Sequence, residues 1–243
     1  MLLPNKKDSI HRLWLYRILT KIADDSYLAS VLYFKGGTCA AIRNLLNRFS
    51  VDLDFDYMGT EHEIPKVKKL LETIFMDLGL MIKDQSSRVP QYFLKYSNNE
   101  GRNNLKIDTF FPPLLGNKYE QVRLVDIDRV LFCQTVETMF ANKLIAFVDR
   151  YKKRGSIAAR DLYDIHYFFL QGYEYDRNII EKYSNQTIEG FLEGLFVFIE
   201  SKISQTVIDQ DLNYLLLPEE FKKIRTILKK ETLLLIKNNL LTL

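Results

Sequence analysis

Three aspartates alternate with apolar residues in the segment SVDLDFDY, residues 50–57. Asp52 and Asp54 are two positions apart, so on a strand their side chains point the same way, about 6.5–7 Å apart along the chain. Two carboxylates this close repel each other unless a cation lies between them, and oxygen ligands suit Mg²⁺. A solvated strand face would carry the same pattern, so the pair predicts a cation site only together with a further ligand.

A third aspartate could supply that ligand. Asp108 lies in LKIDTF, residues 105–110, which also has the pattern of a strand. Three carboxylates that converge from two strands are what a two-metal phosphoryl-transfer site needs. The sequence therefore predicts Asp52, Asp54 and Asp108 as catalytic metal ligands, with Mg²⁺ as the cofactor.

Paired glycines precede the acidic segment in KGGT, residues 35–38. Glycines let the main chain approach a phosphate closely, and a helix that begins behind them offers N–H donors to it. A plain strand-to-helix turn would also use two glycines, and the phosphate-loop pattern GxxxxGK[ST] is absent. The nearby acidic strand favours nucleotide binding, which we predict for Lys35, Gly36, Gly37 and Thr38.

Helical patterns in the second half of the chain carry three further polar residues. Lys143 lies among apolar residues in MFANKLIAF, residues 139–147, and Asp161 and Asp164 are three positions apart in RDLYD, so the two aspartates share one helix face. A structural lysine–aspartate pair would explain them. As functional groups, the lysine could hold a triphosphate and an aspartate could accept a hydroxyl proton.

The element patterns predict an α+β fold in two domains: an α/β core over residues 1–130, with an N-terminal helix, and a helical domain over residues 131–243. A turn is expected at residues 97–104. Strands are expected near residues 51–57, 80–83, 92–96, 105–111 and 121–125, and helices over residues 8–24, 39–46, 64–78, 135–152, 158–170, 177–184, 187–204 and 219–238.

The composition is that of an ordinary folded protein. The chain has 243 residues, 47% of them hydrophobic, and 34 basic against 31 acidic side chains give a formal charge of +3. This balance excludes a disordered or collagen-like chain, and it is too small to establish a nucleic-acid partner. Two cysteines cannot form a disulfide framework, so we expect buried thiols. No apolar run has the length of a signal peptide or a membrane span, which predicts a cytoplasmic protein without a membrane partner.

Taken together, the motifs resemble the AbiEii/AbiGii toxin family of nucleotidyltransferases, within the DNA polymerase beta-like superfamily. The resemblance spans about residues 30–170 and is carried by GGT, RFSVD and LDF, by KID, and by ANKLIAFVDR with RDLYDI. It implies a minimal nucleotidyltransferase core, a mixed sheet flanked by helices, with an added C-terminal helical domain. By position, it implies these site residues: Gly36 and Gly37 at the phosphates, Asp52, Asp54 and Asp108 at the metal, Lys143 at the phosphates, and Asp161, with Asp164 as the other candidate, as a base.

The resemblance also implies a function. Family members are the toxins of toxin–antitoxin and abortive-infection systems, and some transfer nucleotides from NTP to the 3′ end of tRNA. We therefore expect Mg²⁺-dependent transfer of NMP from NTP to an RNA acceptor, tRNA, and a cognate antitoxin as a further partner. Two alternatives stay open: a protein or small-molecule acceptor, and a non-catalytic module that binds nucleotide or RNA.

Overall fold

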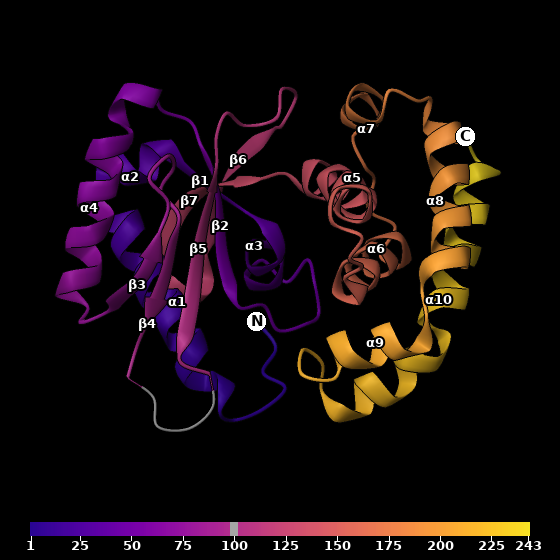
Figure 1. Cartoon of the computed structure of the whole chain (residues 1–243), viewed down its shortest axis with the longest axis horizontal. Coiled ribbons are helices and arrows are strands. Elements are labelled where there is room, and N and C mark those ends of the chain that lie inside the picture. Colours follow the sequence, from indigo (N-terminus) through magenta and orange to yellow (C-terminus); the bar gives the residue numbers. More distant parts are fainter. Residues whose placement is uncertain (98–101) are drawn as a thin grey trace. The chain divides into compact units, whose positions relative to one another are not determined.

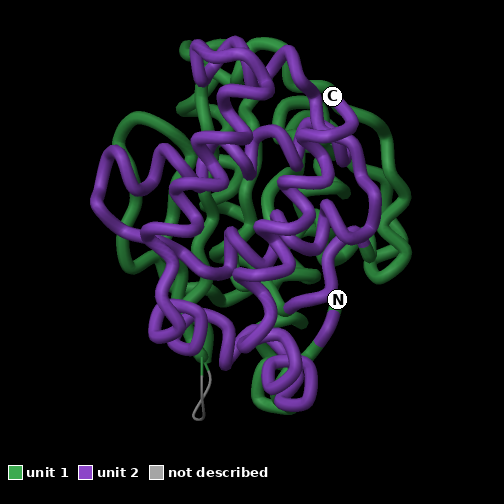
Figure 2. Tube along the Cα trace, turned by 90° about the vertical axis from the view of Figure 1, so that its right-hand side faces the viewer, with its two compact units in different colours: residues 1, 3–44, 49–134 green, residues 2, 45–48, 135–243 purple. Residues whose placement is uncertain are grey.

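The computed structural model describes residues 1–97 and 102–243, and the chain divides into two compact units (Figure 2). Unit 1 comprises residues 1, 3–44 and 49–134, and unit 2 comprises residues 2, 45–48 and 135–243. The short segment 45–48 thus belongs to unit 2, although both of its neighbours in the sequence belong to unit 1. Part of the turn expected at residues 97–104, residues 98–101, lies outside the described residues.

Unit 1 is built on a mixed β-sheet (Figure 1). In the described part of the chain the sheet has seven strands, in the order β3-β4-β5-β2-β1-β7-β6. The central strand β2 pairs parallel with β5 and antiparallel with β1, and β1 pairs parallel with β7. The strands are β1 (Leu32–Lys35), β2 (Asp52–Tyr57), β3 (Met81–Gln85), β4 (Tyr92–Lys95), β5 (Asn104–Phe110), β6 (Tyr119–Leu124) and β7 (Arg129–Gln134).

Helices lie on both faces of this sheet (Figure 1). Helices α1 (Asp8–Asp24), α2 (Ser26–Val31) and α4 (Ile64–Asp77) cover one face, and α3 (Gly36–Ile42) lies on the other. The alternation in β2 buries Leu53 and Phe55 completely, and the strand therefore contributes one apolar side to the core of unit 1. Its aspartates occupy the opposite side, the side of α3. Two short 3₁₀ helices, η1 (Glu61–Glu63) and η2 (Val125–Ile127), complete the unit.

Unit 2 is helical. It contains α5 (Val136–Arg154), α6 (Ala159–Leu170), α7 (Arg177–Ser184), α8 (Ile188–Lys202), α9 (Gln205–Leu212) and α10 (Pro218–Leu240). Helix α5 packs against α6 and α7, and α10 packs against α6, α8 and α9. The boundaries of α5 follow from its sequence, because the Thr135 side chain accepts a hydrogen bond from the main chain of Thr138 and Gly155 ends the helix with a positive φ of 62°.

The predicted α+β fold with a mixed sheet and a helical C-terminal part is confirmed, and most of the expected helices and strands are present. The first helix, α1, begins at Asp8 and ends at Asp24, as expected. The helix expected over residues 39–46 begins at Gly36 and ends at Ile42, since the chain then leaves unit 1 for residues 45–48. Strands β1 and β7 and helices α2 and α9 were not predicted, because all four are short and another element or a turn follows directly.

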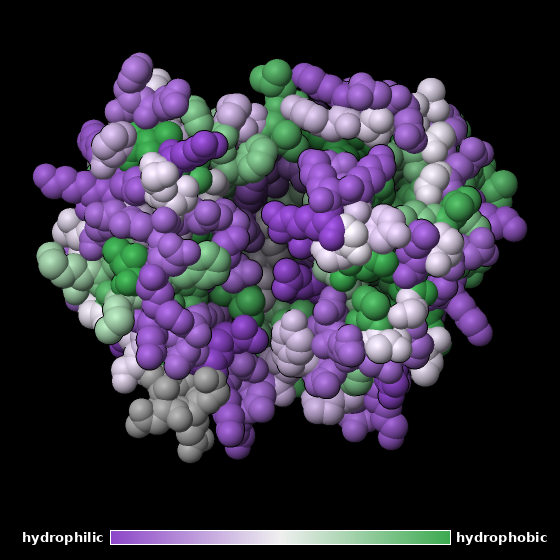
Figure 3. All heavy atoms as spheres, in the orientation of Figure 1, coloured by the Kyte–Doolittle hydropathy of each residue, from purple (hydrophilic) through white to green (hydrophobic). Residues whose placement is uncertain are grey.

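The face of the molecule drawn in Figure 3 is mostly polar. Hydrophilic side chains dominate the face drawn in Figure 3, and hydrophobic residues form scattered patches on it. Among the described residues, no helix has both the length and the apolar character needed to span a membrane. Cys39 and Cys133 are both buried and free, as expected.

Candidate active site

The pairing of β2 with β5 gathers the three predicted carboxylates on one face of the sheet. Asp52 is the register partner of Lys106, and Asp54 is the partner of Asp108. Paired residues on neighbouring strands point to the same face, with the strands about 4.8 Å apart. Asp54 therefore has Asp108 beside it on the next strand and Asp52 two positions earlier on its own.

Gly36 brings the start of α3 against Asp54. A Cβ atom added to Gly36 would lie 2.4 Å from Oδ2 of Asp54 and 3.0 Å from its Cβ, and the φ of Gly36 is +76°. Both observations require glycine, because an L side chain would clash with the carboxylate and strain the main chain. The main-chain N–H groups of the first turn of α3 have no partner within the helix. The glycine therefore places a donor-rich turn directly beside a carboxylate.

We expect Gly36→Ala to lower nucleotidyl transfer by about a hundredfold, because the new methyl group displaces Asp54 and a shift of about 1 Å at a reacting centre has an effect of that size. Steady-state assays with purified protein measure it. Gly79→Ala is the matched control: Gly79 also lies in unit 1 at positive φ, +68°, and its Cβ would meet nothing within 4 Å. Equal losses of transfer in the two variants would show that backbone strain, and not the contact with Asp54, explains the effect.

Thr38 anchors α3 to the beginning of β2. Its side chain is fully buried, and its hydroxyl donates to the carbonyl oxygen of Asp52 and accepts from the Ser50 hydroxyl (2.9 Å). The sequence predicts Thr38 as a nucleotide-binding residue. With the hydroxyl in contact with the chain itself, a contact of Thr38 with a nucleotide would come from its main chain.

The donor chemistry of the three carboxylates fits a divalent cation such as Mg²⁺, since all are hard oxygen ligands on one face. Asp108 is at present bound by two other groups: Gln91 Nε2 donates to it at 2.8 Å, and Lys106 forms an ion pair with it. Within residues 1–97 and 102–243, no group of three or more His, Cys, Asp or Glu side chains is already arranged to hold a metal ion. The set therefore fits by register and ligand type, with Lys106 supplying positive charge to Asp108.

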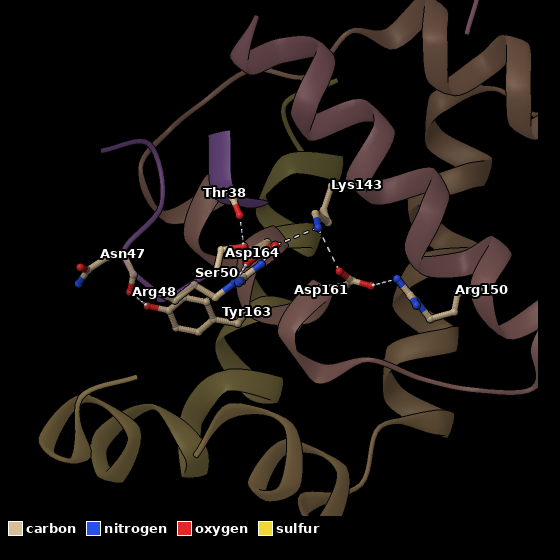
Figure 4. Close-up of polar contacts among 9 residues, drawn as sticks. All are labelled: Thr38, Asn47, Arg48, Ser50, Lys143, Arg150, Asp161, Tyr163 and Asp164. Carbon is tan, nitrogen blue, oxygen red and sulfur yellow. Dashed lines mark hydrogen bonds and ion pairs between the residues drawn. The ribbon is translucent and has the colours of Figure 1, made fainter. Parts of the chain in front are cut away.

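The predicted polar residues of unit 2 form a chain of alternating charges (Figure 4). Lys143 Nζ lies 3.0 Å from Asp161 Oδ1 and 2.9 Å from Asp164 Oδ2. Arg150 pairs with the other oxygen of Asp161 at 3.1 Å, and Arg48 binds both oxygens of Asp164, with Nε at 2.5 Å and Nη2 at 2.8 Å. We call these five residues the ion chain. Its order is Arg48, Asp164, Lys143, Asp161, Arg150.

The ion chain shifts the pKa values of Asp161, Lys143 and Arg48. Burial alone would raise the pKa of Asp161, but Lys143 and Arg150 outweigh burial and hold that pKa below its usual range. Burial acts to lower the pKa of Lys143, and the two carboxylates outweigh it, so this pKa is raised. The pKa of Arg48 is raised in the same way, chiefly by Asp164. A carboxylate with a lowered pKa accepts protons weakly, so these contacts suit charge balance around Lys143 better than proton abstraction.

Sequence reasoning missed Arg48 and Arg150. Arg48 lies in the segment 45–48, and the neighbouring Asn47 offers its carbonyl oxygen to the hydroxyl of Tyr163 at 3.0 Å (Figure 4). No spacing in the sequence links Arg48 to Asp164, which lies 116 positions away. For Arg150 a signal existed, since it lies seven positions after Lys143 and thus on the same face of α5.

The comparison with protein families decides the identity. The model of the family described as the nucleotidyl transferase AbiEii toxin of type IV toxin–antitoxin systems matches residues 17–229. The chain belongs to this family. It is therefore a nucleotidyltransferase of a toxin–antitoxin family, and the resemblance found in the sequence is confirmed. Membership implies a nucleoside triphosphate substrate and a cognate antitoxin.

Solved structures agree with the AbiEii assignment at the level of the fold. A crystal structure described as a "putative nucleotidyltransferase" from H. pylori matches with 17% sequence identity and a TM-score of 0.62, covering 96% of each chain. JHP933 from Helicobacter pylori matches with 19% identity and a TM-score of 0.59, covering 98% of this chain and 94% of that one. No curated protein matches the sequence.

Proposed function

We propose that this AbiEii-family protein transfers NMP from an NTP to an RNA acceptor, tRNA, in a Mg²⁺-dependent reaction. One observation carries the proposal: the register that sets Asp54 beside Asp108, with Gly36 against Asp54. Carboxylates on neighbouring strands next to a glycine turn are suited to hold a nucleotide whose phosphates carry divalent cations. The family assignment supplies the reaction class.

Asp52, Asp54 and Asp108 would hold the divalent cations. Bound there, the cations supply charge neutralisation at the phosphates and lower the pKa of the attacking hydroxyl. Gly36 and Gly37 let the main chain approach the phosphates, because neither carries a side chain that would keep them away.

Two lysines would offset the charge of the departing pyrophosphate. The role of Lys35 is proposed from its position on β1, where it is the register partner of Asp54. Lys143 is proposed from its match to the family motif, and the ion chain keeps it protonated. The role of Asp161, or of Asp164, as the base that removes the hydroxyl proton stays a prediction. The contacts of both favour instead a role in positioning Lys143, since each carboxylate lies between two cations.

The RNA acceptor rests on the family and on the exposed basic residues of the chain. Lys152, Lys153 and Arg154 end α5 and are exposed. Seven further lysines are exposed or partly exposed: Lys66, Lys68 and Lys69 in α4 and Lys222, Lys223, Lys229 and Lys230 in α10. Such side chains bind phosphates of nucleic acids with a strong dependence on salt.

We expect the replacement of Lys152, Lys153 and Arg154 by Gln to weaken tRNA binding and to reduce the slope of log K against log salt by about two to three. Filter-binding titrations at several salt concentrations measure both quantities. The matched control replaces three exposed lysines of unit 1, Lys6, Lys7 and Lys21, and removes the same charge.

Binding of tRNA that is indifferent to salt and to the α5 substitutions would contradict the proposed RNA contact. Mass spectrometry of tRNA, protein and small molecules after incubation with each NTP separates the acceptors. An adduct found on protein or on a small molecule, and not on RNA, would replace tRNA by that acceptor.

A further inference from the structure

Asp56, the third aspartate of the acidic strand, is a buried hub. It is fully buried, although the alternation of β2 predicts it on the same open face as Asp52 and Asp54. Its carboxylate accepts four hydrogen bonds: from Lys35 Nζ at 2.5 Å, Gln134 Nε2 at 2.7 Å, the Tyr119 hydroxyl at 2.7 Å and Asn117 Nδ2 at 3.1 Å.

These contacts engage both oxygens of the carboxylate. Lys35 on β1 binds Oδ1, and the three donors from β6, β7 and the segment before β6 bind Oδ2. The carboxylate of Asp56 is therefore committed to contacts within unit 1. A buried charge requires such compensation, because an unpaired one is expensive in a protein interior.

The contact with Asp56 fixes the position of the Lys35 ammonium group. Lys35 is the register partner of Asp54 on β1, and its ammonium group is held from two sides. It is bound by Asp56, and it lies 4.8 Å from the centre of the Phe110 ring on β5. The side chain of Lys35 keeps 22% of its surface exposed. An ammonium group has three donors, so binding to one carboxylate oxygen leaves capacity for an anion.

We propose that Asp56 is a positioning residue that orients the Lys35 ammonium group for the phosphates of the NTP. A free lysine side chain samples many rotamers and loses that entropy when it is held in one of them. Asp56 removes part of this freedom before the substrate arrives, which strengthens binding through preorganisation. The inference rests on the proposed function, in which Lys35 contacts the triphosphate, and assigns to Asp56 a role that acts only through Lys35.

A double-mutant cycle tests this inference. We expect Asp56→Asn and Lys35→Met each to raise the KM for NTP about tenfold, with a smaller change in kcat, and the double variant to differ from Lys35→Met by less than about twofold. Calorimetric titration with NTP gives the same comparison without catalysis. Effects on KM that multiply to about a hundredfold, or a Lys35→Met variant with the KM of the wild type, would overturn the inference.

A further variant of unit 1 controls for effects that come only from a loss of stability. Tyr92→Phe removes a buried hydroxyl of unit 1 that contacts Glu72 at 3.1 Å, and we expect a lower Tm with an unchanged KM. If Asp56→Asn does not fold, the KM of Lys35→Met is the deciding measurement, because Asp56 keeps three neutral donors in that variant.

The proposed function and the role of Asp56 are contradicted by different results. Transfer that survives Asp54→Asn contradicts the proposed function, whereas a multiplicative cycle together with an inactive Asp54→Asn variant contradicts only the role of Asp56. A wild-type protein that does not bind NTP would overturn both.

Discussion

Asp54→Asn is expected to lower nucleotidyl transfer by about a thousandfold or more while the protein stays folded. Asp54 is the central carboxylate of the candidate site, with Asp108 on the neighbouring strand and Gly36 against its side chain. The amide keeps the shape and removes the charge that would bind the divalent cation. Losing several kcal/mol of charge stabilisation at a phosphoryl-transfer centre slows the reaction by about tenfold per 1.4 kcal/mol.

The rate of label transfer from an α-labelled NTP measures this effect, and circular dichroism and Tm establish that the fold persists. Asp77→Asn is the matched control, because Asp77 is an exposed aspartate of unit 1 at the end of α4. Transfer by Asp54→Asn at the rate of Asp77→Asn would remove Asp54 from the reaction.

Asp164→Ala is expected to destabilise the protein by about 3–5 kcal/mol, because it removes the carboxylate that binds the buried Arg48 through two nitrogens and one of the two carboxylates that bind Lys143. For a chain of this size the loss corresponds to a fall in Tm of about 10 °C. Thermal and urea unfolding measure it. The large effect follows from complete burial: the side chain of Asp164 is 0% exposed and that of Arg48 is 4% exposed.

Asp149→Ala is the control for this substitution. Asp149 forms an exposed pair with Lys153 one turn along α5, at 2.9 Å, and such pairs contribute less than about 1 kcal/mol. Equal unfolding free energies for the two variants would show that the ion chain does not stabilise unit 2.

The pH dependence of the ion chain follows from the signs of its pKa shifts. Asp161 has a lowered pKa, so its contribution to stability is present above its unfolded pKa of about 3.9 and is lost as pH falls through the folded value. Lys143 has a raised pKa, so its contribution is present below about 10.4 and is lost as pH rises through the folded value. The ion chain therefore stabilises unit 2 across the neutral range.

Local patterns were sufficient to predict much of the fold. The alternation in residues 51–57 predicted β2, because one side of that strand is buried in the core of unit 1. The helical periodicity predicted α5, α6 and α8 to within a few residues. The same patterns could not predict β7, since RVLFCQ does not alternate clearly and runs directly into α5. The strand is defined by its pairing with β1 and β6, which a sequence does not display.

The site was predictable in part for the same reason. The spacing of Asp52 and Asp54 fixes their common face, and the strand pattern around Asp108 made it a candidate, but only the register of β2 with β5 sets Asp108 beside Asp54. Alternation assigned Asp56 to the open face. It is buried instead because Tyr119 and Gln134, on strands β6 and β7, donate to its carboxylate and enclose it. Contacts between distant segments decide such burial.

The central claim is that Asp52, Asp54 and Asp108 form the divalent-cation site of a nucleotidyltransferase that modifies RNA. Its most direct test is incubation of the purified protein with each α-labelled NTP, Mg²⁺ and total RNA, followed by gel separation of the RNA. We expect label in RNA of tRNA size for at least one NTP, no label in the presence of EDTA, and no label with Asp52→Asn or Asp108→Asn. Labelling that persists in EDTA or in these variants would contradict the claim.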